Sequence, residues 1–462
     1  MADADLVVIG AGPAGMAAAR TAADAGARVI VLDEQPAAGG QIYRAVGQTT
    51  EALAAILGPD YRAGRDLVAA LDHTNIRHLP GATVWRVDPD GTVCVSVAGR
   101  GRKLAGRRLL LATGALERPV PIPGWTLPGV MTAGAAQILL KTAAMVPRAT
   151  VLAGSGPLLY LLAQQLVRAG RPPLALVETR LPSAWRAAWR HGPGAFRGWR
   201  TLARGAGMLA AIRRAGIPRY RGATGLAVEG AAQAEALRFT AGGREHRIPC
   251  RTVLLHQGVV PNIQITGALR LPHLWDAAQR CFRPVVDEWG GTALEMVFVA
   301  GDGAGIAGAG AAALAGRIAA LQAVHGLGLI DAGARDAAAA PLRRALARER
   351  AARPLLDALY PPSPEVLRPD DATIVCRCEE VTAGEIRALA GLGCLGPNQL
   401  KAFSRAGMGP CQGRYCGLTV TELLAEATGR PPGEVGYYRL RTPLKPVTLG
   451  ELADLAPPEV RA

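Results

Sequence analysis

The sequence is poor in aromatic residues and in long apolar runs, and each shortage excludes a class of protein. Aromatic residues make up 4% of the 462 residues, so the core must consist mainly of Ala, Val and Leu. The longest weakly polar run, residues 304–324, contains Arg317 and many glycines, which argues against a membrane-spanning helix. The opening MADADLVVIGAG has acidic residues where a signal peptide has basic ones. We therefore expect a cytoplasmic protein, at most peripheral to the inner face of the cell membrane.

Lysine is also scarce, although the chain is strongly basic. The formal net charge is +15, from 52 Lys and Arg against 37 Asp and Glu, and only Lys103, Lys141, Lys401 and Lys445 are lysines. So strong an arginine bias in an alanine-rich chain reflects genome composition, and no block of basic residues accompanies a nucleic-acid-binding motif. We expect no nucleic-acid partner. The length predicts about two to four domains.

A complete dinucleotide-binding pattern opens the chain. In LVVIGAGPAGMAAARTAADAGARVIVLDE, an apolar strand leads into Gly10-x-Gly12-x-x-Gly15, then a helix, a second strand and Asp33-Glu34. The first glycine permits a tight turn, the second lets backbone N–H groups approach a pyrophosphate, and the third lets helix and strand pack closely. The helix N-terminus attracts the phosphates, and Asp33 stands where an acid accepts hydrogen bonds from a ribose.

An imperfect copy of this pattern follows at residues 149–178. ATVLAGSGPLLYLLAQQLVRAGRPPLALVE repeats the strand, the turn with Gly154 and Gly156, the helix, the second strand and the acid, Glu178. Leu159 replaces the third glycine, and we expect its side chain to push the helix from the strand and narrow the site. Glu178 would disfavour a 2′-phosphate, so NADH is favoured over NADPH if either binds. The sequence leaves open whether NAD(H) binds here or the domain is only a scaffold.

Four further motifs resemble those of the two-dinucleotide-domain flavoproteins, in that family's order. LLLATGALERP includes Ala112, Thr113 and Gly114, and a predicted strand over residues 296–300 ends on Gly301-Asp302. Gly39-Gly40-Gln41 resembles a flavin-contacting loop, and Gly258 with Pro261-Asn262 resembles the return to the FAD domain. The resemblance implies FAD held by Gly10, Gly12, Pro13, Ala14, Gly15, Asp33, Glu34, Gly40, Gln41, Ala112, Thr113, Gly114, Gly301 and Asp302.

The redox-active Cys-x-x-Cys pair of the disulfide reductases in that superfamily is missing, which excludes disulfide reduction. Cys94, Cys250 and Cys281 are isolated, and we expect them to be small buried residues. In a reducing compartment the eight cysteines should be free thiols or metal ligands rather than disulfides.

Four cysteines near the C-terminus form a ligand pattern. Cys376-x-Cys378 is followed after thirty-two residues by Cys411-x4-Cys416, with glycines around the second pair. Thiolates one residue apart can face one metal centre, whereas a disulfide between them would be strained. Zinc would fit four thiolates equally well, but the flavin motifs favour a redox centre. The spacing resembles the [2Fe-2S] domain of the bacterioferritin-associated ferredoxin type; we expect helices over residues 382–389 and 397–405, with Cys394 in the core.

The whole chain resembles the larger subunit of bacterial heteromeric flavin dehydrogenases, such as hydrogen cyanide synthase, opine oxidase and D-hydroxyproline dehydrogenase. ERPVPIPGWTLPGVMTAGAAQ and CRCEEVTAGEI support this resemblance. It implies a partner resembling an FAD-dependent amino-acid oxidase, in some members a small ferredoxin-like subunit, FMN at an interface between subunits, and a quinone or other electron acceptor. This chain would relay electrons, because no convincing set of His, Tyr or Arg residues near the FAD motifs could orient an amine substrate.

The segment 180–221 contains ten arginines and no acidic residue, with Trp185, Trp189 and Trp199 among them. Trp185 and Trp189 would share one helix face. The segment is either a docking surface for an acidic partner or anionic lipid, or a solvated basic face with ordinary core tryptophans.

These observations predict an α/β flavoprotein of the glutathione or thioredoxin reductase type with a small helical iron–sulfur domain. The expected divisions are an FAD domain (1–119 and 255–330), an NAD(P)-binding-like domain (120–254), a linker (331–368), a [2Fe-2S] domain (369–438) and an extended tail (439–462). The leading hypothesis is an electron-transfer subunit of an amine or amino-acid dehydrogenase. The alternatives are a self-contained NADH-dependent reductase of an acceptor protein and a non-enzymatic iron–sulfur module.

Overall fold

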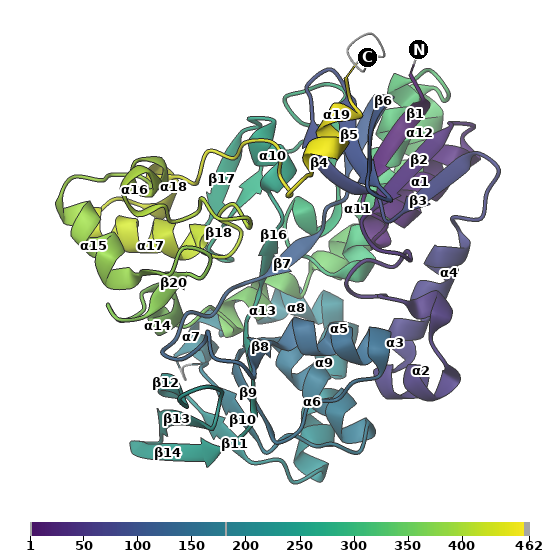
Figure 1. Ribbon diagram of the computed structural model, residues 1–462. Coiled ribbons are helices and arrows are strands. Elements are labelled where there is room, and N and C mark those ends of the chain that lie inside the picture. The colour runs from purple at the N-terminus through teal and green to yellow at the C-terminus, as the bar shows by residue number, and fades with distance from the viewer. Residues whose placement is uncertain (1, 181–182, 457–462) are drawn as a thin grey trace.

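The computed structural model describes residues 2–180 and 183–456 and contains two α/β sheets and a C-terminal helical module (Figure 1). The first sheet has seven strands in the order β3-β2-β1-β6-β5-β4, and β19 pairs with β6. β1, β2, β3, β6 and β19 run parallel, with Leu6 opposite Val29 and Ile9 opposite Leu111. The strands are β1 (Ala4–Ile9), β2 (Val29–Asp33), β3 (Ile76–Pro80), β4 (Thr83–Val87), β5 (Thr92–Val97), β6 (Arg100–Leu111) and β19 (Val297–Val299).

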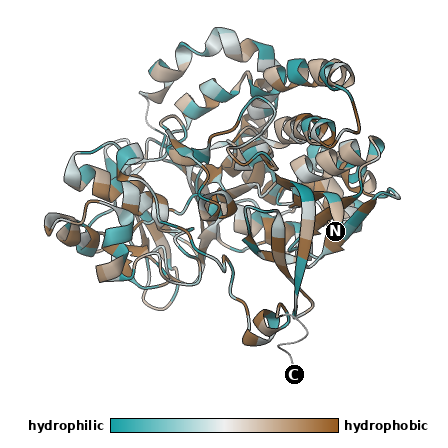
Figure 2. Ribbon diagram, turned by 90° about the horizontal axis from the view of Figure 1, so that it is seen from above, coloured by the Kyte–Doolittle hydropathy of each residue, from teal (hydrophilic) through white to brown (hydrophobic). Residues whose placement is uncertain are grey.

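Two helices rich in alanine and glycine pack together against this sheet. Small residues let α1 (Pro13–Asp24) and α11 (Ala309–Gly326) approach closely, since a Cβ on Gly316 would lie 2.1 Å from the Ala14 carbonyl oxygen. Figure 2 shows hydrophobic strands beside the N-terminus, enclosed by helices of mixed hydropathy. The segment between β2 and β3 adds η1 (Val46–Gln48), α2 (Glu51–Leu57), α3 (Pro59–Arg62) and α4 (Gly64–Ala69).

The second sheet has five parallel strands in the order β11-β10-β9-β15-β8, beside the antiparallel sheet β12-β13-β14. Its strands are β8 (Val130–Thr132), β9 (Thr150–Ser155), β10 (Ala175–Glu178), β11 (Arg219–Arg221), β12 (Thr224–Glu229), β13 (Ala236–Ala241), β14 (Arg244–Pro249) and β15 (Thr252–Gln257). Its helices are α5 (Ala133–Ala143), α6 (Pro157–Arg168), α7 (Ala184–Trp189), α8 (Gly192–Ala195), η2 (Phe196–Gly198) and α9 (Trp199–Arg214).

The chain crosses between the two sheets twice, through β7 (Ala115–Glu117) and β16 (Val259–Pro261), which pair antiparallel. After the second crossing come α10 (Gln264–Ala268), the pair β17 (His273–Asp276) and β18 (Cys281–Pro284), and η3 (Gly301–Gly303). The return segment expected near Gly258 therefore reaches the first sheet beside the outgoing strand.

The segment expected to be a linker is largely helical. It forms α12 (Ala332–Arg350), α13 (Arg353–Leu359) and α14 (Pro364–Leu367). Asp331 caps α12 by accepting a hydrogen bond from the Ala334 N–H. These helices contact α11, α7 and the C-terminal module, so the segment is packed structure rather than a free connection.

The C-terminal module has its own hydrophobic core, with Cys394 inside it as expected. It contains β20 (Ile374–Cys376), β21 (Val381–Thr382), α15 (Ala383–Gly391), α16 (Pro397–Ser404), α17 (Gly417–Thr428) and α18 (Pro432–Val435). The two expected helical stretches are therefore present. Thr382 and Glu385 form a capping box that begins α15.

The tail returns from this module to the first sheet, where Leu444 N–H donates to the Trp85 carbonyl and α19 (Leu449–Ala453) contacts β6. None of the helices in the described part of the chain is long and apolar enough to cross a membrane.

Candidate functional site

The first glycine turn is built from three glycines with different tasks. Gly10 has φ 108°, and a Cβ there would lie 2.4 Å from the Ala112 carbonyl oxygen. A Cβ on Gly15 would lie 1.8 Å from the Gly10 carbonyl oxygen. At Gly12 the nearest atom to an added Cβ is the Gly40 Cα, at 3.8 Å, an ordinary van der Waals distance, so nothing crowds this position. Two glycines pack the turn, and the middle one leaves room for a ligand.

The loop with Gly39, Gly40 and Gln41 lies directly over this turn. The Gly39 N–H donates to the Ala11 carbonyl at 2.8 Å, and a Cβ on Gly40 would come within 2.8 Å of the Gly12 Cα. Only glycine fits such an approach at φ 60°. The structure thus brings two motifs from separate parts of the sequence to one cradle.

Thr113, Gly114 and the Gly301-Asp302 motif meet at the same edge of the sheet. The Thr113 hydroxyl donates to the Asn262 carbonyl at 3.1 Å, and the Asn262 N–H donates to the Gly114 carbonyl at 3.0 Å. A Cβ on Gly301 would lie 2.8 Å from the Ala14 Cβ. One oxygen of Asp302 accepts hydrogen bonds from Ala307 and Gly308, which leaves the other oxygen for a ligand hydroxyl.

The two acids that end β2 have different surroundings. The Asp33 carboxylate accepts hydrogen bonds from the N–H groups of Ala11 (2.6 Å) and Gln35 (2.8 Å), and burial raises its pKa. Glu34 is exposed and lies 2.5 Å from the Lys445 ammonium. Asp33 therefore fixes the turn, contrary to the simple expectation that it faces the ribose, and Glu34 is the more accessible acid.

Sequence reasoning missed two buried cations beside the cradle, Arg44 and Lys141. Arg44 is 8% exposed and Lys141 is 4% exposed. The Lys141 ammonium donates to the Gln41 carbonyl at 3.0 Å and to Gln137 at 2.8 Å. Lys141 comes from α5, outside the first sheet, so no local pattern around the glycine motif could reveal it.

The second turn is closed where the first is open. Leu159 is 1% exposed and lies in the core of the second sheet. Gly154 needs its positive φ because a Cβ would lie 1.8 Å from the His256 carbonyl oxygen, and a Cβ on Gly156 would lie 3.0 Å from the His256 ring. The His256 ring therefore lies against the second turn. It is held there by Glu117, 2.6 Å from His256 Nδ1.

Glu178 is buried in a network of protein groups. Tyr160 donates to its carboxylate at 2.5 Å, and Arg219 donates to both oxygens at 2.9 and 3.1 Å. The side chain is 3% exposed. Because its oxygens are engaged in this way, Glu178 is poorly placed to discriminate between NADH and NADPH.

The non-helical segment between α13 and α14 covers the second site. Tyr360 packs edge-on against Tyr160, with ring centroids 6.1 Å apart, and Arg180 lies over the Tyr360 ring. The Ser363 N–H donates to the Gln257 side chain, at the carboxyl end of β15. The carboxyl edge of a parallel sheet is where such domains bind nucleotides. Here Tyr360 and Ser363 of the protein itself lie at that edge.

The four C-terminal cysteines approach one another in two pairs. The Cys416 thiol lies near enough to Cys376 to stabilise its thiolate, which lowers the pKa of Cys376 to about 6. Cys378 and Cys411 interact as the second pair, and burial raises the pKa of Cys378. A Cβ on Gly409 would lie 2.3 Å from the Cys378 Cβ, and the Gly407 N–H lies 3.5 Å from the Cys376 sulfur. Among the described residues, no three His, Cys, Asp or Glu side chains are arranged around a single metal ion.

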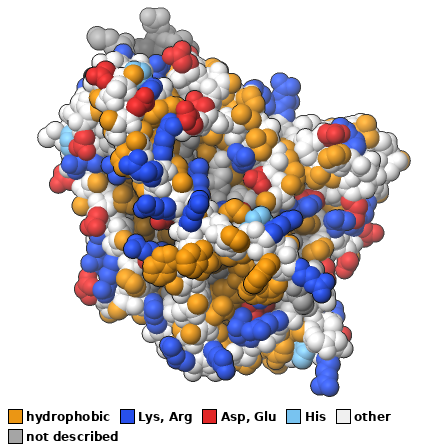
Figure 3. Space-filling model, turned by 180° about the vertical axis from the view of Figure 1, so that it is seen from behind, with side chains coloured by type: hydrophobic (Ala, Val, Ile, Leu, Met, Phe, Trp, Pro, Cys, Tyr) orange, Lys and Arg blue, Asp and Glu red, His pale blue; other side chains and the backbone are white. Residues whose placement is uncertain are grey.

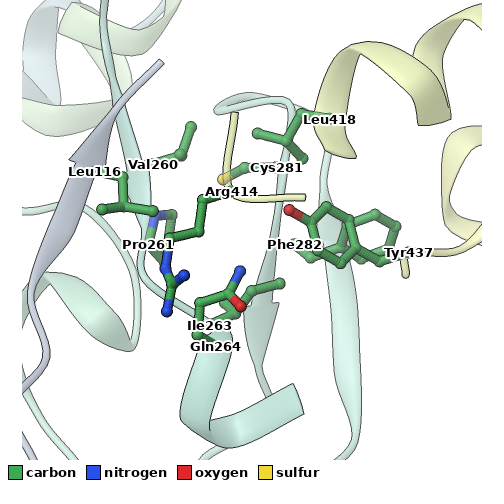
Figure 4. A pocket seen from close by; sticks show the side chains of 10 residues that line it. All are labelled: Leu116, Val260, Pro261, Ile263, Gln264, Cys281, Phe282, Arg414, Leu418 and Tyr437. Atoms are coloured by element: carbon green, nitrogen blue, oxygen red, sulfur yellow. The ribbon is translucent and has the colours of Figure 1, made fainter. Parts of the chain in front are cut away.

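A small cavity separates the strands beside the FAD motifs from the cysteine module (Figure 4). Leu116, Pro261 and Phe282 line it from the strands, and Arg414 and Tyr437 come from the module. The Arg414 guanidinium donates to the carbonyls of Cys411 and Leu444. Arg414 thus joins the cysteine loop to the C-terminal tail at Leu444.

Two protein-family models match the chain. The pyridine nucleotide-disulphide oxidoreductase model matches residues 4–328, and the sarcosine oxidase A3 domain model matches residues 371–455. The first covers both sheets, and the second covers the cysteine module and most of the tail. Neither match assigns a metal to the cysteines.

Curated relatives and solved structures give a consistent picture. The chain is 47% identical to an opine oxidase subunit of Rhizobium meliloti, over 98% of this chain and 87% of that one. It is 32% identical to hydrogen cyanide synthase subunit HcnB of Pseudomonas aeruginosa, over 97% and 98% of the two chains. L-proline dehydrogenase from P. horikoshii shares the fold, with a TM-score of 0.72 at 20% identity over 98% of this chain and 79% of that one. The chain is an oxidoreductase that belongs, with its opine oxidase relative, to the pyridine nucleotide-disulphide oxidoreductase family of FAD-binding flavoproteins.

Proposed function

We propose that this chain is the FAD- and [2Fe-2S]-containing electron-transfer subunit of a heteromeric amine or amino-acid dehydrogenase. Its substrate would be an imino acid, an opine, hydroxyproline or a glycine-type compound, oxidised on a partner subunit. The observation that carries the proposal is the contrast between an open first dinucleotide site and a second site closed by His256 and Tyr360. A chain that cannot take electrons from NADH needs another donor, and the relatives named as subunits suggest a partner protein.

The first site suits FAD because the cradle around Gly12 would be filled by any side chain there. In this proposal Gly10, Gly12 and Gly40 surround the pyrophosphate, Glu34 accepts from the ribose, and Asp302 accepts from the ribityl chain. When bound, FAD supplies the capacity to accept two electrons and release them one at a time. The protein's part is to hold the dinucleotide at the junction with the cysteine module.

The cysteine module suits a two-iron cluster, because four thiols from one module meet in two pairs. Each iron of such a cluster takes two cysteine ligands, so an arrangement around a single ion is not required. Cys376, Cys378, Cys411 and Cys416 would hold the cluster, and the nearby Gly407 N–H would donate to a ligand sulfur. Zinc is the alternative that the same ligands allow.

The domain divisions expected from the sequence become part of this proposal, with residues 331–368 serving as a helical cover for the second site. Three further components follow from the family resemblance alone. They are a quinone acceptor, a small ferredoxin-like subunit, and FMN at the interface with the amino-acid-oxidase-like partner.

The partner's landing surface, in this proposal, includes α7 to α9. Trp189 is 83% exposed and Phe196 is 76% exposed, with Trp185 and Trp199 also at the surface. Exposed tryptophans among arginines, without acidic residues, are typical of protein interfaces. Figure 3 shows hydrophobic side chains gathered with Lys and Arg on the face turned away in Figure 1.

A self-contained NADH-dependent reductase is the second candidate, favoured only by the surviving Gly154 and Gly156 turn. A non-enzymatic iron–sulfur module leaves the complete first dinucleotide site unexplained.

Co-expression with an amino-acid-oxidase-like partner tests the leading proposal. The complex should oxidise an amino or imino acid with an artificial dye, whereas this chain alone should not. Turnover of such substrates by the isolated chain at ordinary enzymatic rates would refute the proposal.

Metal analysis tests the cluster separately. Anaerobically purified protein should contain two iron and two sulfide per chain, the number that a [2Fe-2S] centre requires. Cys376→Ser or Cys411→Ser should lose them, whereas Cys394→Ser should keep them. Zinc in place of iron would refute the relay.

A further inference from the structure

Arg44 is a buried cation whose charge is not balanced by a contacting carboxylate. Its side chain is 8% exposed, and its Nε has no hydrogen-bond acceptor among the described residues. No ion pair joins Arg44 to a carboxylate in residues 2–180 and 183–456; Asp33 and Glu34 act on it only through space. A buried guanidinium without a counter-charge is costly, so proteins retain one mainly where a ligand supplies the missing anion.

Lys141 is a second buried cation in the same region. Its ammonium donates to two neutral oxygens, those of Gln41 and Gln137, and lies 5.9 Å from the centre of the Tyr61 ring. Burial lowers the pKa of Lys141 to about 7, and the charge of Arg44 acts in the same direction. The two cations are therefore near enough to repel each other.

The position of these two side chains points to the first glycine turn. Lys141 holds the carbonyl of Gln41, whose neighbour Gly40 lies against Gly12. Arg44 follows that loop by three residues, next to the end of β2. The acids of this region are already engaged, since Asp33 accepts two backbone N–H groups and Glu34 pairs with Lys445. Two positive charges thus border the first glycine turn, where a side chain on Gly12 would meet no atom closer than 3.8 Å.

We infer that Arg44 and Lys141 form an anion site that takes the diphosphate of a dinucleotide bound at the Gly12 turn. The diphosphate carries two negative charges, which match the two cations, and it would meet the N-terminus of α1 from the other side. The identity of the dinucleotide as FAD rests on the proposed function, whereas the anion site depends only on the diphosphate. Arg44 is a direct ligand, and Lys141 both contributes charge and positions the Gly40 loop.

Arg44→Met tests the inference because a ligand role and a structural role predict opposite changes in the ligand-free protein. Removal of a buried charge without a counter-charge should leave the melting temperature of the ligand-free protein unchanged or higher. The affinity for FAD and for ADP should fall by roughly 10- to 100-fold, the value of one charge-assisted contact. Binding of riboflavin, which has no phosphate, should not change. Arg77→Met, at an exposed arginine on β3, is the matched control and should change neither property.

Arg44→Lys should restore part of the ADP affinity, and the salt dependence of ADP binding should weaken in Arg44→Met. If Arg44→Met lowers the melting temperature while ADP and FAD still bind as in the unmodified protein, the cation is structural and the inference is wrong. If ADP binds in an Arg44-dependent manner but FAD does not bind, the anion site stands and the proposed cofactor fails.

Discussion

The two glycine turns of this chain have nearly the same sequence pattern but opposite surroundings. In the first, a Cβ on Gly12 would meet only the Gly40 Cα, at 3.8 Å, and Glu34 is exposed. In the second, Gly156 lies against the His256 ring, and Glu178 is buried with Arg219. The contrast teaches that a glycine turn binds a dinucleotide only if the neighbouring elements leave its open side free.

The closing groups of the second turn come from distant parts of the chain. His256 comes from β15, Arg219 from β11, and Tyr360 from the segment after α13. A tyrosine pair and an ion pair of the protein's own groups therefore lie at the edge of the second copy. The first copy keeps two buried cations without a contacting carboxylate in the described part of the chain, and such cations cost stability unless a ligand is bound.

Of the substitutions considered, Gly12→Val should have the largest effect on FAD binding. Gly12 has an ordinary φ of −79°, and its Cβ position is free of clashes, so the substituted chain should fold. The added methyl groups would occupy the diphosphate space, and FAD retention should fall on the order of 1,000-fold. Spectroscopic titration of the ligand-free protein with FAD measures this. If the Gly12→Val protein purified with a full complement of FAD, the first turn would not be the FAD site, and the contrast drawn between the two turns would be wrong.

Substituting the acid of each copy should give opposite results. Glu178→Gln removes the counter-charge of Arg219 and should lower the free energy of unfolding by about 3 kcal/mol without changing FAD affinity. Glu34→Gln should change stability by less than about 1 kcal/mol, since it is an exposed pair, and should weaken FAD binding. Denaturant unfolding and FAD titration of both variants test this pair. Equal effects of the two substitutions on FAD binding would contradict the account.

The stability of the ligand-free protein should depend on pH through Lys141. Its pKa is about 7 in the folded protein and 10.5 for an ordinary lysine, so the unfolded chain binds more protons between these values. The free energy of unfolding should therefore rise as pH increases from about 7 to about 10. The charged or titratable groups that face Lys141 are Arg44 and Tyr61. Lys141→Met should remove this rise; an unchanged pH profile in Lys141→Met would show that another group causes it.

Tyr360→Ala should have the smallest effect, both on stability and on the reaction of the flavin with NADH. It removes one aromatic contact over the second copy, worth about 1 kcal/mol. His256 and Leu159 still occupy the turn, so NADH should not become a reductant of the flavin. Differential scanning fluorimetry and anaerobic mixing with NADH measure the two properties. Rapid flavin reduction in this variant would mean that Tyr360 alone closes an otherwise competent site.

The sequence predicts the local parts of the structure and misses those that depend on tertiary contacts. The strand, turn and helix around Gly10 follow from spacing within thirty residues, and the helices on either side of Cys394 follow from apolar periodicity. The pairing of Glu178 with Arg219 joins residues 41 apart. No pattern within the second copy reveals that pair, nor the cover that Tyr360 provides.

Arg44 and Lys141 show a second limit of prediction from the sequence. Their chemical character is visible in the sequence, but their burial and their distance from carboxylates are properties of the packed structure. The tryptophans of α7 to α9 illustrate the reverse case, in which apolar side chains turn out to be exposed. The sequence places them either at a docking surface or in an ordinary core, and the structure exposes Trp185, Trp189 and Trp199 because the helices that carry them lie at the surface.

Anaerobic addition of stoichiometric NADH to the purified flavin-containing protein tests the central claim most directly. The account predicts that the flavin absorbance stays in its oxidised form, because the second dinucleotide site is closed by the chain itself, while dithionite reduces the same sample. Rapid bleaching of the flavin by NADH would contradict the account and favour a self-contained NADH-dependent reductase.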